Sequence, residues 1–153
     1  MKIMDILVKD AVVVELAAQA KEDILAEMVA SLAKVKPELD PEKLLGVLVD
    51  REKLQSTGIG EGVAIPHGKM TGLDGLMASF GRSTAGVDFD SIDGKPTQLF
   101  FLLVVPEHSG GQHLKALARI SRFFRDAAFR ERLMLAEETD DILRAIEEED
   151  GKF

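Results

Sequence analysis

The chain has 153 residues, 46% of them hydrophobic, no cysteine and a formal net charge of -8. This length suits a domain that buries about two-thirds of its extended-chain surface, so we expect residues 1–153 to form a single domain. The composition excludes disulfides, thiolate nucleophiles and cysteine-ligated metal centres, and the negative charge opposes binding to nucleic acid. Because the sequence has neither an apolar run of the ~20 residues a membrane span needs nor a secretory signal, we expect a cytoplasmic protein without membrane insertion.

The first third of the chain predicts a short strand and two helices. Residues 11–14 are apolar and mostly β-branched, which favours a strand. From Lys21 to Ala33 the apolar residues recur on one face at helical spacing. A second helix is expected to begin at Pro41, after the N-cap residue Asp40, and to end between Arg51 and Leu54.

The middle of the chain predicts strands separated by glycine-rich turns. Residues 63–65 are strand-like, and Pro66 is expected to end that strand. Residues 76–80 and 99–105 are further strand candidates, with a turn-rich segment at 86–94 between them. The run at 99–105 is apolar on both faces, which is typical of a central strand covered by helices on both sides.

Two helices are predicted in the remaining part. Residues 112–124 have helical spacing, and residues 138–148 form a final helix with its apolar side turned inward. The first of these helices is expected to bury one stripe, made of Leu114, Leu117, Ala118, Ser121 and Phe124. The alternation of strands and helices predicts a layered α/β domain with a largely buried sheet.

The chemistry of the sequence is concentrated in residues 55–69. Glycines at alternate positions allow positive φ and a close approach of backbone N–H groups to an anion such as phosphate. Pro66 stiffens the chain before His67, and Gly68 removes side-chain bulk after it, which favours presentation of the imidazole to another protein. Neutral imidazole can attack phosphorus without an additional base. The alternative interpretation is a plain connecting loop with a surface histidine.

A second group of polar residues follows the apolar strand, between Pro106 and Leu114. The carboxyl end of a strand and the N-terminus of the next helix are both favourable places for an anion. His113 lies in the first turn of that helix, where it could instead be a capping or surface residue. His108 lies in the same loop and is the less favoured partner for His67, since His113 directly precedes the helix-starting leucine.

Taken together, these motifs resemble the enzyme IIA domain of the fructose and mannitol class of the phosphoenolpyruvate phosphotransferase system. The resemblance rests on Arg51-Glu52-Lys53-Leu54, Ser56-Thr57-Gly58-Ile59-Gly60 and Ala64-Ile65-Pro66-His67, and it covers nearly the whole chain. It implies a mixed, mostly parallel sheet flanked by helices on both faces. Within the family, the stand-alone chain and His67-Gly68-Lys69 are most similar to the nitrogen-regulatory type of IIA protein.

The resemblance also implies a role for each matching residue. His67 is the phosphoryl acceptor, Arg51 the active-site arginine and His113 the second histidine beside the acceptor. An arginine fork can stabilise charge on the transferring oxygens, although Arg51 could also act only on the C-terminus of its own helix. Further donors to the phosphoryl group are expected from the neighbouring run, Ser56, Thr57, Gly58, Ile59 and Gly60.

The resemblance implies a phosphoryl carrier rather than a stand-alone turnover enzyme, with no cofactor and no metal. Its donor would be an HPr- or NPr-type phosphocarrier, and its partners either regulatory target proteins or a IIB domain. We therefore predict a nitrogen-regulatory signalling protein, with a fructose- or mannitol-type IIA component for sugar uptake as the alternative. A third hypothesis, a metal-dependent hydrolase that uses the histidines with carboxylates, lacks any recognisable ligand spacing.

Overall fold

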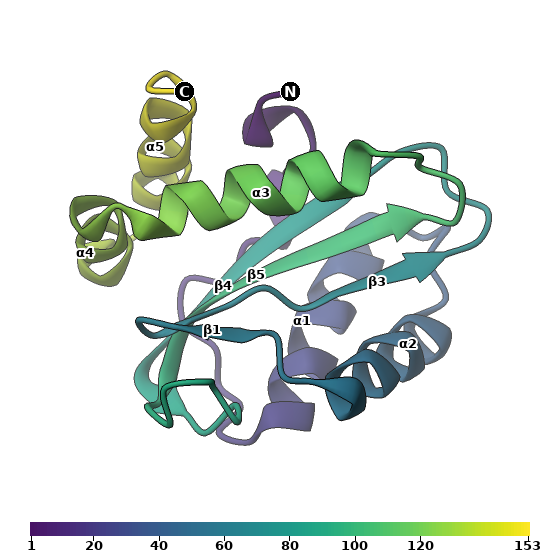
Figure 1. Ribbon diagram of the computed structural model, residues 1–153, viewed down its shortest axis with the longest axis horizontal. Helices are drawn as coiled ribbons and strands as arrows, with labels where there is room; N and C mark the ends of the chain where they lie inside the picture. The colour runs from purple at the N-terminus through teal and green to yellow at the C-terminus, as the bar shows by residue number, and fades with distance from the viewer.

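The computed structural model describes residues 1–153 and has a mixed sheet between two layers of helices (Figure 1). One layer consists of α1 (Lys21–Val35) and α2 (Pro41–Leu54). The other consists of α3 (Gln112–Arg125), α4 (Ala127–Leu135) and α5 (Thr139–Asp150). The strands are β1 (Gly58–Gly60), β2 (Val63–Ala64), β3 (His67–Met70), β4 (Met77–Val87) and β5 (Thr97–Pro106). The predicted layered α/β fold, with helices on both faces of the sheet, is confirmed.

Strand β5 is the centre of the sheet, as the apolar run predicts. Its side chains alternate between two hydrophobic cores, because successive residues of a strand point to opposite faces. Leu99, Phe101, Leu103 and Val105 pack with α3, α4 and α5, whereas Phe100, Leu102 and Val104 pack with α1 and α2. Full burial of each large side chain contributes about 1.5–3 kcal/mol. Because β5 buries such side chains on both faces, it links the two layers of helices.

One edge of β5 pairs with two strands in succession. β2 pairs in parallel at Val63 opposite Leu99, and β3 pairs in parallel at His67 opposite Leu103. β2 ends at Ala64, one residue before the predicted end, because Ile65 leaves this edge and pairs with Thr57. After Pro66 the chain resumes the same edge as β3, which the sequence does not predict. On the other edge β4 runs antiparallel to β5, and β1 pairs antiparallel with β2.

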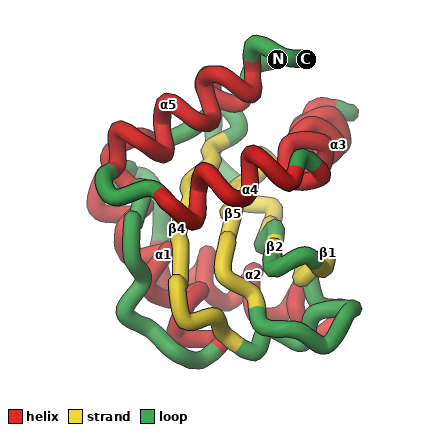
Figure 2. The backbone as a smooth tube through the Cα atoms, turned by 90° about the vertical axis from the view of Figure 1, so that its left-hand side faces the viewer, coloured by secondary structure: helices red, strands yellow, loops and turns green.

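Figure 2 views the same arrangement from the side, with the chain termini next to each other beyond α5. The side chain of Asp150 accepts hydrogen bonds from the backbone N–H groups of Ile3 and Met4, each at 2.9 Å. Arg119 of α3 donates to the same carboxylate at 3.0 Å. The end of α5 therefore holds the start of the chain against α3.

Several predicted elements differ from the structure. The expected strand at 11–14 is replaced by a 3-10 helix over Lys9–Ala11 and a single parallel bridge from Val13 to Gly81. β4 begins at Met77 and extends to Val87, well beyond the predicted end. In α3 the buried side chains are Ala116, Ile120, Phe123 and Phe124, whereas Leu114 is 62% exposed. This face of α3 is buried in place of the predicted one because its burial removes more apolar area from water.

Helix α4 was not predicted because its sequence pattern is weak and its contacts are distant. Asp126 caps its N-terminus by accepting from Ala128 and Phe129. At its other end, the carbonyl oxygens of Leu133 and Ala136 accept from the buried guanidinium of Arg82, at 2.9 and 2.5 Å. A long-range cap of this kind leaves no signal in the local sequence.

Gly68 has a packing role that differs from the one expected. Gly68 and Met70 are buried and face the α1 and α2 layer, so His67 faces the α3 side of the sheet. A Cβ atom built on Gly68 would lie 2.5 Å from Cγ1 of Val47 in α2. The missing side chain therefore lets α2 pack closely on β3, rather than opening access to the imidazole.

We expect Gly68→Ala to lower the free energy of unfolding by about 1–3 kcal/mol through overpacking against α2. The measurement is urea denaturation, with a lower midpoint at an unchanged slope. Val47→Ala in the same chain should recover part of the loss. Gly75→Ala is the control, since no atom lies within 4 Å of its Cβ position. Equal midpoints for Gly68→Ala and Gly75→Ala would contradict the packing role.

Candidate functional site

His67 lies in a pocket of about 360 Å³ between the end of α2, strand β1 and α3. The structure brings together His67, Arg51 and four residues of the predicted phosphoryl-binding run, Ser56, Thr57, Gly58 and Ile59. Leu117 and Ser121 of α3 and Ile92 of the loop before β5 close the pocket, and sequence reasoning did not assign them to the site. Gly60 lines an adjoining pocket instead, which shares Ile59 and Ser121 with this one.

The ring of His67 is oriented by a hydrogen bond to the backbone two residues earlier. Its Nδ1 atom lies 2.8 Å from the carbonyl oxygen of Ile65. A carbonyl oxygen can only accept, so Nδ1 carries the hydrogen of the neutral ring and Nε2 carries the lone pair. The lone pair that is free to react in the neutral ring is therefore that of Nε2.

The surroundings of His67 lower the pKa of its imidazole. Burial is the main cause, because it disfavours the charged ring. The hydrogen bond to Ile65 opposes this, the positive charges of Arg51 and His113 add to the lowering, and the carboxylate of Glu52 opposes it. The net effect is a lowered pKa, which favours the neutral form of the His67 ring.

Arg51 lies in the last turn of α2, and its Nη1 atom donates to the carbonyl oxygen of Gln55 at 2.7 Å. The helix-end contact considered for this residue is therefore present. It uses one of the five N–H donors of the guanidinium. Since Arg51 also lines the His67 pocket, the remaining donors suit oxygens of a phosphoryl group.

His113 lies in the first turn of α3, one turn before Leu117. Its Nδ1 atom is 3.1 Å from the carbonyl oxygen of Gly110 and 3.2 Å from Oγ of Ser109. The carbonyl requires a hydrogen on Nδ1, so Nε2 can donate a hydrogen bond only from the protonated ring. His108 is exposed in the loop before α3.

The hydroxyl groups of the Ser56 to Gly60 run are already engaged. Ser56 donates its hydroxyl hydrogen to the carbonyl oxygen of Phe89 at 2.6 Å and accepts from the N–H of Gly58 at 3.0 Å. Thr57 donates from both its N–H and its hydroxyl to the carboxylate of Glu52. These residues therefore shape the loop, and they offer a phosphoryl group fewer free donors than the sequence suggests.

Two glycines of this segment have the backbone conformation that was expected. Gly60 and Gly62 have φ values of 92° and 76°, in the left-handed region, and they reverse the chain between β1 and β2. Glu61 between them is also left-handed, with φ of 58°. The N–H of Glu61 donates to the carboxylate of Asp93 at 3.1 Å, which holds the turn against the loop before β5.

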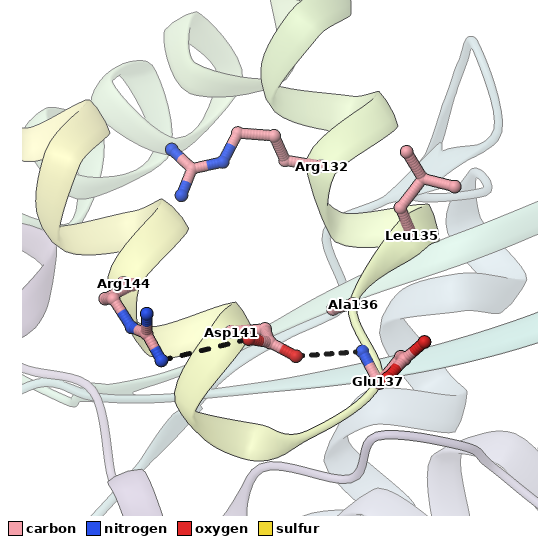
Figure 3. Close-up of a pocket in the computed structure, with 6 residues that line it drawn as sticks. All are labelled: Arg132, Leu135, Ala136, Glu137, Asp141 and Arg144. Carbon is pink, nitrogen blue, oxygen red and sulfur yellow. Dashed lines mark hydrogen bonds and ion pairs between the residues drawn. The ribbon is translucent and has the colours of Figure 1, made fainter.

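A third pocket, of about 400 Å³, lies between α4 and α5 (Figure 3). It is lined by Arg132, Leu135, Ala136, Glu137, Asp141 and Arg144. Both of its arginines are paired, Arg144 with Asp141 at 3.9 Å and Arg132 with Glu148 at 2.5 Å. It contains no histidine and no residue of the predicted site.

Two of the other sequence hypotheses concern metals and membranes. No group of three or more histidine, aspartate or glutamate side chains is arranged to hold a metal ion. Among the helices, none combines the length and the apolar character that crossing a bilayer requires.

Comparisons with known proteins agree with the resemblance found in the sequence. Residues 5–149 match the family described as phosphoenolpyruvate-dependent sugar phosphotransferase system, EIIA 2. The nitrogen regulatory protein of Bradyrhizobium diazoefficiens is 42% identical over 126 residues, which is 82% of each chain. The crystal structure of nitrogen regulatory protein IIA-Ntr from Neisseria meningitidis has a TM-score of 0.86 at 34% identity, over 93% of this chain and 97% of that one.

A longer relative also matches. The fructose-specific EIIABC component of the phosphotransferase system of Bacillus subtilis is 37% identical over 150 residues. The alignment takes up 98% of this chain but only 24% of that protein. The match with the family and the relatives of similar length together identify the present chain. It belongs to the EIIA type 2 family of the phosphoenolpyruvate-dependent sugar phosphotransferase system.

Proposed function

We propose that this chain is a phosphoryl carrier that accepts a phosphoryl group on Nε2 of His67. The donor is the phosphohistidine of an HPr- or NPr-type phosphocarrier. The lone pair of Nε2 forms the new N–P bond as the N–P bond of the donor breaks, and the donor imidazole leaves. The observation that carries this proposal is the Nδ1 contact with Ile65, which leaves Nε2 unprotonated in the pocket.

Phosphoryl transfer requires alignment of the two nitrogens and stabilisation of the charge on three equatorial oxygens. Arg51 supplies a permanent positive charge at the pocket wall. His113, at the start of α3, lies close enough to His67 for its charge to act on the ring. The transferred group therefore meets the guanidinium of Arg51 from α2, while β3 holds the nucleophile.

Exposed apolar side chains next to the pocket support a protein partner. Ile59 and Ile92 line the pocket and are 41% and 71% exposed. Leu54 and Leu114, adjacent in sequence to the site, are 83% and 62% exposed. Apolar groups gathered at a surface site are typical of protein interfaces. We infer that the phosphocarrier docks on this apolar rim, defined by Leu54, Ile59, Ile92 and Leu114.

The nitrogen-regulatory role is favoured by relatives of similar length with that name, at up to 42% identity over 82% of each chain. In this role the phosphorylated and free forms bind different target proteins. The fructose-specific relative favours the alternative, in which the phosphoryl group passes to a IIB domain for sugar uptake. Transfer of label from the phosphorylated chain to purified IIB proteins separates the two roles.

Incubation with phosphoenolpyruvate, enzyme I and an HPr-type carrier should add one acid-labile phosphoryl group to the protein. We expect His67→Ala to abolish the labelling, since no other group in the pocket is a comparable nucleophile. The measurement is gel autoradiography or intact mass. His108→Ala is the control and should be labelled like the unmodified chain, because His108 lies in the exposed loop outside the pocket. Labelling of His67→Ala would refute the assignment.

The transfer rate should depend on pH through the lowered pKa of His67. Protonated His67 has no lone pair on Nε2. The transfer rate should therefore be highest at pH values above the pKa, where the ring is neutral, and should fall as the pH decreases through the pKa. Because burial lowers this pKa, the midpoint should lie below the ordinary value of 6.5. NMR titration of the ring should give the same midpoint and a hydrogen on Nδ1 of the neutral form. A midpoint at or above 6.5 would contradict the buried, neutral nucleophile.

The apolar rim can be tested at Ile92. We expect Ile92→Ser to raise KM for the phosphocarrier roughly tenfold at unchanged kcat, since a loss of about 1.4 kcal/mol of interface burial corresponds to that factor. Leu135→Ser is the matched control, because Leu135 is also 71% exposed but lies at the pocket between α4 and α5. Equal effects of the two substitutions would argue against docking on this rim.

A further inference from the structure

Glu52 is a buried carboxylate directly behind the His67 pocket. It lies in the last turn of α2, and its side chain is 5% exposed. A negative charge at this position opposes the helix dipole, and burial of a carboxylate is costly unless it is fully partnered. Both effects disfavour glutamate here, so specific contacts have to offset them.

The first set of contacts joins Glu52 to His67 through the backbone. Both carboxylate oxygens lie 3.1 Å from the N–H of Thr57, and the Thr57 hydroxyl donates to the same group. The carbonyl oxygen of Thr57 accepts from the N–H of Ile65 at 3.0 Å. The carbonyl oxygen of Ile65 accepts from Nδ1 of His67 at 2.8 Å. A continuous chain of hydrogen bonds therefore runs from Glu52 to the nucleophile.

The second set of contacts ties Glu52 to α1 and to the loop before β5. Nζ of Lys21, the first residue of α1, lies 2.9 Å from Oε1 of Glu52 and 3.3 Å from Oδ2 of Asp90. It also lies 4.8 Å from the ring centroid of Phe89. The carbonyl oxygen of Phe89 accepts from the hydroxyl of Ser56. Lys21 and Glu52 thus hold the segment of Ser56 and Thr57 from two sides.

Lys21 remains charged in this setting. Burial by itself lowers the pKa of its ammonium group, but the hydrogen bonds and charges of Glu52 and Asp90 outweigh it and raise the pKa. The groups whose charges act on His67 are Arg51, Glu52 and His113, and Glu52 is the only anion among them. The carboxylate therefore both fixes the loop and offsets positive charge at the nucleophile.

We propose that Glu52, held in place by Lys21, is a positioning residue for phosphoryl transfer, which fixes Thr57 and through it the Ile65 carbonyl that orients His67. This inference rests on the proposed function of His67. Glu52 does not touch the phosphoryl group. It acts on the loop that borders the pocket and on the tautomer of the ring, so that Nε2 presents its lone pair in the direction of attack.

The test compares Glu52→Gln with the unmodified chain in single-turnover transfer from phosphorylated HPr-type carrier. We expect the maximal rate to fall about 10- to 100-fold, because small displacements of a reacting group have effects of this size. KM for the carrier should stay unchanged, since the apolar rim is intact. In NMR titrations the pKa of His67 should decrease in Glu52→Gln, because the opposing anion is lost.

Lys21→Gln gives a second, independent test with the opposite sign. It leaves Glu52 as an acceptor for Thr57 but removes the cation that holds the carboxylate in place, so the transfer rate should fall, although less than in Glu52→Gln. Without the cation the carboxylate acts more strongly on His67, and the pKa of His67 should increase. The two opposite shifts show that both charges act on His67, and a lower maximal rate at unchanged KM in the folded variants is the readout that a merely structural role would not give. If Glu52→Gln does not fold, the rate and titration of Lys21→Gln decide the question.

Glu27→Gln is the matched control. The carboxylate of Glu27 also accepts from loop N–H groups, those of Ala17 and Ala18 at 2.9–3.1 Å, but it has no link to the pocket. The Glu27→Gln protein should lose stability without a change in transfer rate or in the titration of His67. Unchanged rate and titration in folded Glu52→Gln, or in Lys21→Gln, would overturn the proposal. If the unmodified chain accepts no phosphoryl group, the proposed function fails, while the NMR titrations still test the link to His67.

Discussion

The interruption at Ile65 and Pro66, on the edge of β5, is the constraint that shapes the site. β5 is buried on both faces, so its edges have to be paired with backbone on either side. The carbonyl oxygen of Pro66 continues this pairing by accepting from Leu103 at 2.9 Å. Ile65 is released from it, and its N–H and carbonyl bind Thr57 and His67 instead. A single irregular residue therefore connects the sheet, the glycine loop and the imidazole.

The distribution of charge follows from this arrangement. The protein carries a net charge of -8, yet the positive charges of Arg51 in α2 and His113 in α3 act on His67, and Lys21 of α1 pairs with Glu52. A phosphoryl group brings close to two negative charges, which the cations offset locally. The carboxylate of Glu52 acts on His67 in the opposite sense to these cations. On the proposed function, the charges around His67 suit both the free and the phosphorylated form of the protein rather than only one of them.

Much of the fold and the core of the site could be predicted from the sequence, for physical reasons that also explain the failures. β5 has a strong signal because its sequence is apolar on both faces. α2 has one because Asp40 and Pro41 mark its start. His67-Gly68-Lys69-Met70 has no strand pattern, because its pairing is imposed by the edge of β5. The engagement of the Ser56 and Thr57 hydroxyls and the role of Glu52 depend on contacts between α1, α2 and the loop before β5. These segments are far apart in the sequence and come together only in the folded chain.

The surface around His67 also links the carrier chemistry to signalling. The pocket opens among exposed apolar side chains, including Ile92 and Ile59. A target that covers this rim has to remove water from whatever occupies the pocket. An empty pocket permits this at little cost, whereas a dianionic phosphoryl group must stay hydrated or find new cationic partners. On the proposed function, partner choice therefore depends on the phosphorylation state without any change of fold, provided that donor and target both dock on this rim.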